Sequence, residues 1–446
     1  MKRTANESKN SVNYSALTTA SQKNSSGLIT LAAVLLCGLT ASASNPKVVA
    51  EQGFTITPNA ETAIVLKTQP DAACDLHAVG TSDSRSMRFY ANGDGYVKIH
   101  ANAREGMDGR VQLDCSSNGK VVSYPLHLLA SSSPAADMPA PQSHVPTPKG
   151  SKVRPGLTEA QAQSLTDDEL ANLGYTERPD ALSSPDQYAK WLDHVSRPMT
   201  VLPQHLVSTN VTASPGSYTS SNWSGLEAHS TTKRKYSAVT ATWSVPPILI
   251  GDPSGNPTYS AFWIGLDGDR TKDLVQAGTE QDAQEIWGIL FTNYYAWSEL
   301  LPNQPTEQGV FGVNAGDEIQ VEVWIGTGSG APNPNGGYGS FRIIDWTQSN
   351  ESLFYVPLAG TYYNGTEAEW IMERPTVGGS LPELSEYFPA TMVDASALQV
   401  KGTKWIPCGT AANRNISMYN GNDELSQAFW LGTGSTAISF LWLNFQ

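Results

Sequence analysis

Residues 319–325 read Ile-Gln-Val-Glu-Val-Trp-Ile, with an apolar side chain at every odd position. Such alternation predicts a β-strand with one buried face, because successive side chains of a strand point to opposite sides. A stretch rich in glycine, proline and asparagine, residues 326–340, then indicates a connection to the next strand. Similar patterns recur over residues 217–446, where helix-type periodicity is scarce. We therefore expect an all-β fold there, one large antiparallel sandwich or barrel.

The chain ahead of this region divides into three parts. Residues 44–130 contain shorter alternating runs, which predict a small β-sandwich domain with a propeptide or accessory role. Residues 131–157 form a linker rich in proline and serine. Residues 158–206 hold capping-box patterns that begin at Thr158 and Thr166, and these predict short helices. The helical part is either a folded pro-segment or a brace that packs on its neighbour.

The N-terminus predicts export. Residues 1–43 combine basic residues, an apolar run at 27–39 and small residues after it, which is the pattern of a secretory signal peptide. We therefore expect a secreted protein, extracellular or periplasmic, without stable membrane association. An oxidising compartment makes a disulfide between Cys74 and Cys115 the default pairing. Cys408 is then left over as a buried thiol.

The composition argues against several classes of function. The chain carries 28 Lys and Arg against 42 Asp and Glu, a formal net charge of -14, and this charge repels nucleic-acid phosphates and anionic lipid. His229 is the only histidine after residue 205. A Ser-His-Asp or Cys-His apparatus would need that single ring, and a zinc site would lack ligands. We expect no nucleic-acid partner, no metal and no cofactor, so carboxylates, amides and aromatic rings remain to carry chemistry.

Several predicted strands have one face that mixes acids, amides and aromatic rings. Within residues 367–373 the odd positions include Glu367, Glu369 and Glu373, whereas the even positions are apolar. The same alternation gives further residues that share a face: Trp263 with Asp267, Trp297 with Glu299, and Gln276 with Glu280. Such faces fit a groove that binds an extended polymer, and the alternative is a solvated outer face. Exposed tryptophans are costly, which favours the groove.

Six motifs in the main region resemble those of the eqolisins, or glutamic peptidases, and occur in the same order. They are Ser221-Asn-Trp-Ser-Gly225, Val239–Pro246, Ala261–Asp269, Leu274–Gly278, Tyr295–Glu299 and Ala368–Glu373. The similarity covers residues 217–446 and none of the chain before them. It implies a sandwich of two curved antiparallel sheets like those of legume lectins, with residues 207–446 as the catalytic domain.

The resemblance also implies site residues. The catalytic glutamine of the family corresponds to Gln276, and the catalytic glutamate corresponds to Glu369. The positions that line the family's cleft correspond to Trp223, Trp263, Asp267, Trp297 and Glu299. The chain departs from the family because it lacks the disulfides common in fungal members. It also carries Glu367 where a neutral residue is usual, and we expect this charge to shift the pKa of Glu369.

On this basis we expect a monomeric acid endopeptidase that acts on proteins and peptides and is made as a zymogen. Upstream basic residues would dock on the acidic domain at neutral pH and be released in acid; they include Lys149, Lys152, Arg154, Arg178 and Arg197.

A lectin-like glycosidase or carbohydrate-binding protein is the alternative to the peptidase. Glu280-Gln-Asp-Ala-Gln-Glu285 matches the Glu-x-Asp-x-x-Glu pattern of laminarinase-like enzymes. The residues between the acids of that pattern are normally apolar because they point into the core. Here they are Gln, Ala and Gln, so the match is weak.

Overall fold

The computed structural model describes most of the chain after the first 45 residues. The predicted signal peptide, residues 1–43, lies outside the described part. The described residues are 46–80, 85–176, 178–182, 185–209, 211–212, 219–328, 332–358, 363–387, 390–399, 405–430 and 432–445.

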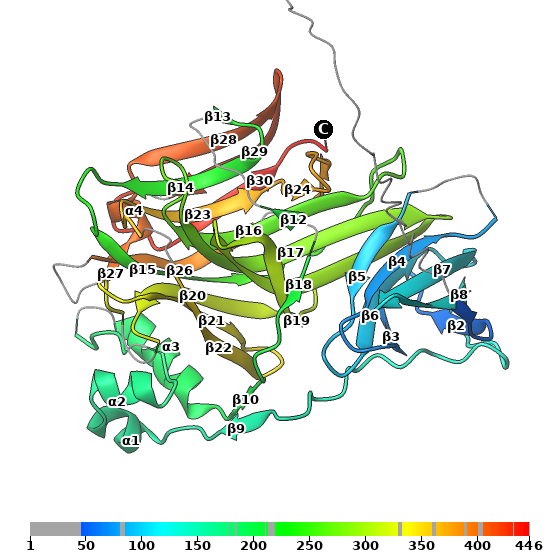
Figure 1. Ribbon diagram of the computed structural model, residues 1–446, viewed down its shortest axis with the longest axis horizontal. Coiled ribbons are helices and arrows are strands. Elements are labelled where there is room, and N and C mark those ends of the chain that lie inside the picture. Colours follow the sequence, from blue (N-terminus) through cyan, green and yellow to red (C-terminus); the bar gives the residue numbers. More distant parts are fainter. Residues whose placement is uncertain are drawn as a thin grey trace, which may run out of the picture. The chain divides into compact units, whose positions relative to one another are not determined.

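Two antiparallel sheets form the main domain (Figure 1). The front sheet runs, in spatial order, through β28 (Arg414–Asn420), β14 (Trp223–His229), β23 (Glu367–Glu373), β16 (Thr258–Leu266), β17 (Leu274–Ile286), β18 (Ile289–Leu301) and β19 (Gln304–Gly312). The back sheet runs through β22 (Asn350–Pro357), β21 (Tyr338–Asp345), β20 (Glu318–Gly326), β15 (Tyr236–Ser244), β26 (Ala390–Gln399), β30 (Ile438–Trp442) and β29 (Asp423–Trp430) to β28. The predicted all-β sandwich is confirmed.

Short elements complete this domain. They are β11 (Val207–Ser208), β12 (Val211–Thr212), β13 (Thr219–Ser220), β24 (Thr376–Val377), β25 (Glu383–Leu384), β27 (Trp405–Pro407) and α4 (Cys408–Ala411). Cys408 is buried, and burial raises the pKa of its thiol to about 12.

The hydrophobic core lies between the two sheets. Val321, Val323 and Ile325 of β20 are fully buried in the same cluster as Trp370 and Met372 of β23. The apolar side of each alternating strand therefore faces the partner sheet, as the sequence pattern predicts. The opposite side of β23, with its glutamates, is left on the outer face of the front sheet.

An N-terminal β unit precedes the main domain. One sheet contains β1 (Lys47–Val48), β2 (Gln52–Ile56), β8 (Lys120–Ala130), β7 (Asp108–Ser117), β4 (Ala73–Ala78) and β5 (Met87–Tyr90). The antiparallel pair of β3 (Thr62–Lys67) and β6 (Tyr96–Ala103) contributes side chains to the same hydrophobic core, and β6 also pairs with β18 of the front sheet. Cys74 and Cys115 are bonded with an S–S distance of 2.10 Å, which confirms the predicted disulfide.

The chain between the β unit and the main domain is partly helical. The helices are α1 (Glu159–Ser164), α2 (Asp167–Asn172) and α3 (Pro185–Ser196), flanked by β9 (Lys152–Arg154) and β10 (Met199–Val201). Both predicted capping boxes form: the Thr158 and Thr166 hydroxyls each accept the N–H of the third helical residue. Strand β10 pairs with β22, so this segment lies against the back sheet.

Three of the predicted docking cations make other contacts. Arg154 donates to both carboxylate oxygens of Glu351 in the back sheet, at 2.8 and 2.5 Å. Arg178 pairs with Asp167, and Arg197, which directly follows α3, pairs with Asp193 of that helix. These ion pairs do not involve the front sheet, so the structure does not support electrostatic docking of these three residues across it.

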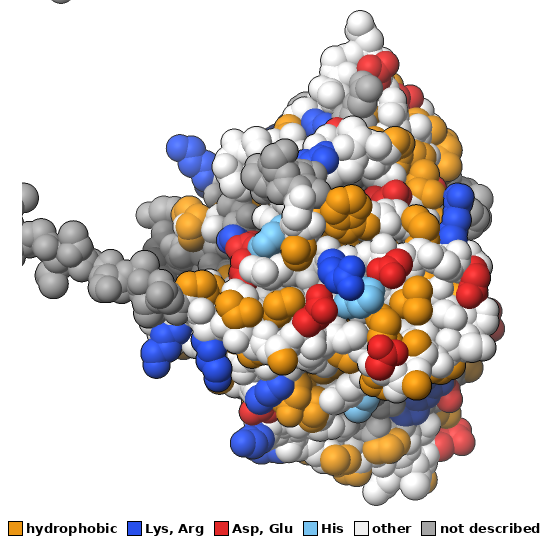
Figure 2. Space-filling model, turned by 90° about the vertical axis from the view of Figure 1, so that its right-hand side faces the viewer, with side chains coloured by type: hydrophobic (Ala, Val, Ile, Leu, Met, Phe, Trp, Pro, Cys, Tyr) orange, Lys and Arg blue, Asp and Glu red, His pale blue; other side chains and the backbone are white. Residues whose placement is uncertain are grey.

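The surface drawn in Figure 2 carries acidic and basic side chains interspersed with apolar ones. Within the described residues, no helix has both the length and the apolar character needed to cross a membrane.

Candidate active site

A row of residues in direct register crosses the outer face of the front sheet. Glu369 of β23 stands opposite Glu227 on one side and Gly265 on the other, and Gly265 stands opposite Gln276. Gln276 in turn stands opposite Glu299 of β18. Residues directly opposite in antiparallel strands share a face, so these side chains lie in one line. The structure therefore brings the predicted Glu369 and Gln276 to the same place.

Gly265 leaves a gap between the acid and the amide. A Cβ atom at this position would lie 3.3 Å from the Gln276 Cβ and 3.0 Å from the Trp263 ring. Leu274 Cδ1 would lie equally close, at 3.0 Å, so the position is closely surrounded. Because residue 265 is a glycine, no side chain of its own stands between Glu369 and Gln276 in the row.

Glu369 is a buried carboxylate without hydrogen bonds. Its side chain has no exposed surface, and neither oxygen has a hydrogen-bond partner among the described residues. Burial raises the pKa of Glu369 well above its ordinary value, and the charges of Glu227, Glu367, Asp269 and Asp267 raise it further. A carboxyl group in this setting can take up and release a proton during a reaction.

Gln276 is held in a fixed orientation. Its amide nitrogen donates a hydrogen bond of 2.6 Å to Glu299, and both side chains are fully buried. An amide nitrogen carries two hydrogens. One is used by Glu299, so a second remains available for another acceptor.

The three predicted tryptophans gather beside this row. Trp223, Trp263 and Trp297 belong to one buried cluster on the outer face, together with Ile371 and Ile416. The Trp223 and Trp263 rings meet edge to face with centroids 5.0 Å apart, and the Trp263 indole donates to Glu373 at 2.8 Å. The rings are fully buried, so the outer face is not a solvated one.

Asp267 lies outside the row. Its carboxylate accepts hydrogen bonds from the backbone N–H groups of Asn364, Gly365 and Thr366, at 3.0, 2.6 and 2.8 Å. These residues lead into β23. Asp267 therefore fixes the start of the strand that carries Glu369, and burial followed by the charge of Asp273 raises its pKa to about 7.

A second group of carboxylates lies further along the same face. Glu280, Asp282, Glu307 and Glu373 are all buried. Burial raises the pKa of Asp282 and of Glu373 to about 8, and it raises the pKa of Glu280 and Glu307 well above the ordinary value. No sequence pattern singles out Glu307, because only the pairing of β18 with β19 brings it to this face.

The glycosidase pattern does not converge in space. The register between β17 and β18 is unbroken from Leu274 to Ile286. Without a bulge, Glu280 and Asp282 face one side of the sheet, whereas Glu285 faces the other side and is exposed. Three acids divided in this way cannot flank one glycosidic bond.

Glu227, His229 and Glu367 form a further cluster, of which Glu227 is the member that no sequence pattern singled out. Their ligand atoms lie within 4.8 Å of one another, a spacing that a metal ion could bridge. Arg414 already donates to Glu227, and the Arg270 guanidinium lies 3.2 Å from the His229 ring nitrogen. We therefore interpret the cluster as ion pairs. Parity with Trp223 along β14 could have placed Glu227 on the site face.

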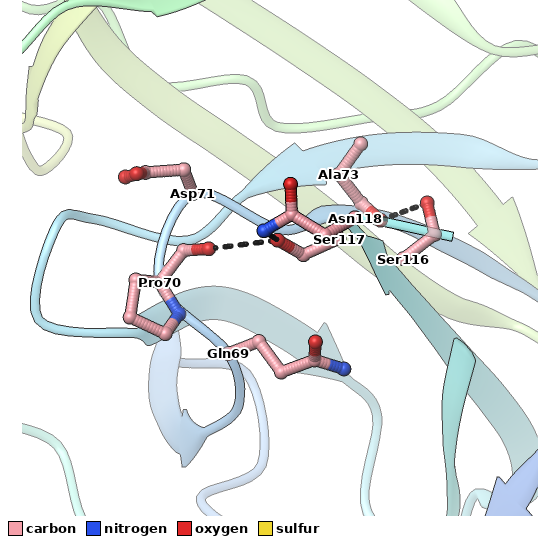
Figure 3. A pocket seen from close by; sticks show the side chains of 7 residues that line it. All are labelled: Gln69, Pro70, Asp71, Ala73, Ser116, Ser117 and Asn118. Carbon is pink, nitrogen blue, oxygen red and sulfur yellow. Dashed lines mark hydrogen bonds between the residues drawn. The ribbon is translucent and has the colours of Figure 1, made fainter. Parts of the chain in front are cut away.

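A separate cavity of about 500 Å³ lies on the N-terminal β unit (Figure 3). It is lined by Gln69, Pro70, Asp71, Ala73, Ser116, Ser117 and Asn118. Its side chains are engaged with nearby backbone: Ser117 donates to the Pro70 carbonyl and Ser116 to the Ala73 carbonyl. The cavity shares no residue with the row.

Comparison with known proteins shows the family of the main domain. Residues 221–440 match the sequence model of the Peptidase A4 family. This segment is a Peptidase A4 domain. The resemblance to the eqolisins is thereby confirmed, and the chain is a peptidase, a class of hydrolase. No match was found among curated proteins.

Three solved structures of peptidases are similar to this chain over half of its length or less. Scytalido-glutamic peptidase with a peptide-based transition-state analog is 20% identical, covers 50% of this chain and 98% of its own, and has a TM-score of 0.38. SCP-B, an eqolisin in complex with the tripeptide Ala-Ile-His, is 17% identical, with coverages of 50% and 98% and a TM-score of 0.37. Aspergilloglutamic peptidase from Aspergillus niger is 20% identical, with coverages of 42% and 99% and a TM-score of 0.35.

Proposed function

We propose that the chain is a secreted acid endopeptidase in which Glu369 and Gln276 hydrolyse peptide bonds of proteins. The observation that carries this proposal is the row itself. A carboxylate with no hydrogen-bond partner among the described residues and an oriented amide stand on either side of Gly265, which places no side chain between them.

The proposed reaction needs a base for water and a donor for the oxyanion. Ionised Glu369 takes a proton from water while the water oxygen attacks the carbonyl carbon. The carbonyl oxygen becomes negative and accepts a hydrogen bond from the second amide hydrogen of Gln276. As the C–N bond breaks, Glu369 gives its proton to the leaving nitrogen and is restored. Gln276 is neutral, so it does not compete with Glu369 for this proton.

We also propose that the enzyme is made as a zymogen. Glu369, Gln276 and the three tryptophans are fully buried, so a peptide cannot reach them in this conformation. The chain that enters the domain pairs at Val207–Ser208 with β19 and at Val211–Thr212 with β24. Thr209 also donates its backbone N–H to the Glu307 carbonyl. Displacement or cleavage of this entering chain would open the site.

The upstream parts have separate roles in this proposal. The helical segment packs His194 on Trp346 with ring centroids 3.8 Å apart, and it is a brace on the back sheet. The N-terminal β unit is a permanent module. Export by residues 1–43 puts the enzyme outside the cytoplasm, where its substrates are proteins and peptides and where it works as a monomer.

Digestion of casein at about pH 4 tests the proposal, because solvent that enters the opened site lowers the raised pKa of Glu369 toward the ordinary value of a glutamate. We expect cleavage that persists with a chelator and with a serine-directed reagent. A new N-terminus of the chain itself, mapped after the same incubation, would support the zymogen. If neither casein nor the chain were cut from about pH 3 to 6, the proposal would fail; release of reducing sugar from a glucan instead would support the glycosidase.

A further inference from the structure

Glu227 is a direct cross-strand neighbour of the proposed base. It stands directly opposite Glu369 in the pairing of β14 with β23, and it has no exposed surface. Side chains directly opposite in antiparallel strands have Cβ atoms about 5 Å apart. Two carboxylates are therefore adjacent on a buried face, an arrangement in which both cannot ionise easily.

The two carboxylates differ in their partners. Arg414 of β28 stands opposite Glu227 on its other side, and its guanidinium donates to both Glu227 and Asp269. Glu369 has no hydrogen bond to any described residue. The cation therefore favours the negative form of Glu227, whereas no hydrogen-bond donor among the described residues favours the negative form of Glu369.

The charged groups around Glu369 come from four elements. Strand β14 contributes Glu227 and His229, and β23 contributes Glu367. The loop after β16 contributes Asp267, Asp269 and Arg270, and β28 contributes Arg414. His229 lies 3.3 Å from Glu367 and 3.7 Å from Glu227. Glu299 lies beyond Gln276 and is engaged by its amide. Acids outnumber cations here, so a proton is retained within the cluster.

We propose that Glu227, held by Arg414, is a positioning residue for Glu369: its charge keeps the proton on Glu369 and sets the acid limb of the peptidase activity. This inference rests on the proposed function.

The directions of the pKa shifts of Glu227 and Glu369 agree with this proposal. Burial raises the pKa of Glu227 to about 7 while Arg414 opposes the rise, and Glu227 contributes the largest charge effect on the raised pKa of Glu369. As pH rises, Glu227 ionises before Glu369. When the site opens, solvent lowers the pKa of both glutamates. Glu227 still ionises first, because Arg414 stays paired with it.

The test is the pH profile of kcat/KM for a peptide substrate, measured on the activated enzyme with Glu227→Gln. Removing the neighbouring charge makes ionised Glu369 easier to form, so we expect the acid limb to move to lower pH by about one unit. Arg414 keeps Asp269 as a partner, so the variant does not strand a buried cation. Glu227→Met, which is uncharged and of similar length, is expected to give the same shift if Glu227→Gln folds poorly.

Two controls separate this role from simple stabilisation. Glu227→Asp keeps the charge, and its pH profile of kcat/KM is expected to keep the acid limb of the parental enzyme. Glu322→Gln breaks another carboxylate–arginine pair, with Arg342 at 2.8 Å in the back sheet, and is expected to leave the limb unmoved. A parental limb in folded Glu227→Gln and Glu227→Met, with Glu369→Gln inactive, overturns the role of Glu227 alone. Full activity of Glu369→Gln would instead overturn the proposed function.

Discussion

Gly265 lies between the proposed base and the proposed oxyanion donor. Its lack of a side chain is needed for Glu369 and Gln276 to act on the same peptide group. An alanine Cβ there would lie 3.0 Å from both Leu274 Cδ1 and the Trp263 ring, and 3.3 Å from Gln276 Cβ. These contacts are tight enough that the neighbours must shift. The space between Glu369 and Gln276 would also be reduced.

We expect Gly265→Ala to lower kcat/KM at least tenfold while costing about 1–3 kcal/mol of stability, as overpacking does. The measurement is peptide hydrolysis in acid, paired with thermal unfolding. Gly309→Ala in β19 is the matched control, because its Cβ would meet its nearest neighbour at 3.5 Å. Gly265→Ala with parental activity would show that the gap is not used.

The site residues show what a sequence can and cannot predict at this scale. The alternation along β23 predicted which face carries Glu369, and the eqolisin motifs pointed to Gln276 as its partner. The catalytic roles of both residues stay predictions. The ion pair of Glu227 with Arg414 depends on the pairing of β14 with β28, which are far apart in the sequence. Asp267 was predicted to bind substrate, yet its carboxylate holds backbone N–H groups, a role that no local pattern reveals.

The hairpin of β17 and β18 connects the main domain to the N-terminal β unit. Ile286, Ile289 and Phe291 at its tip are buried in the hydrophobic core of the N-terminal β unit. β6 pairs with β18 over the same stretch, and Thr292 donates to Glu61 at 3.1 Å. The change of composition at the linker separates the two parts in the sequence, but no sequence pattern indicates that a hairpin from one part completes the core of the other.

We therefore expect the N-terminal β unit to stay bound after the chain is cut. A site for a specific protease placed at the exposed residues 142–144 would allow the cut to be made at will. The two pieces should elute together in size exclusion and separate only in denaturant. Phe291→Ala should weaken this association by about 3–5 kcal/mol. Free elution of the N-terminal piece, with the rest folded and active, would contradict a permanent module.

Buried carboxylates dominate the electrostatics of the whole molecule. Burial raises the pKa of Glu227 and Asp345 to about 7 and the pKa of Asp282 and Glu373 to about 8. In the unfolded chain these groups titrate near pH 4. Between these values the folded state binds more protons than the unfolded state. The free energy of unfolding therefore falls as pH rises through this range.

The protein should accordingly be most stable in acid, with a Tm that declines from about pH 4.5 to pH 8. Thermal unfolding monitored by circular dichroism across this range measures the effect. The double variant Asp282→Asn, Glu373→Gln removes two of the responsible groups and should flatten the decline. A Tm that rises between pH 4.5 and pH 7 would contradict this description of the buried acids.

An isosteric substitution tests the proposed role of Glu369 as the catalytic base. Glu369→Gln keeps the size of the side chain and removes its ability to take up a proton. We expect turnover of a peptide substrate at about pH 4 to fall below detection, while Tm and peptide binding stay close to those of the parent; Glu285→Gln, on the opposite face, should remain active. Parental turnover by Glu369→Gln, or loss of turnover in Glu285→Gln instead, would contradict the account.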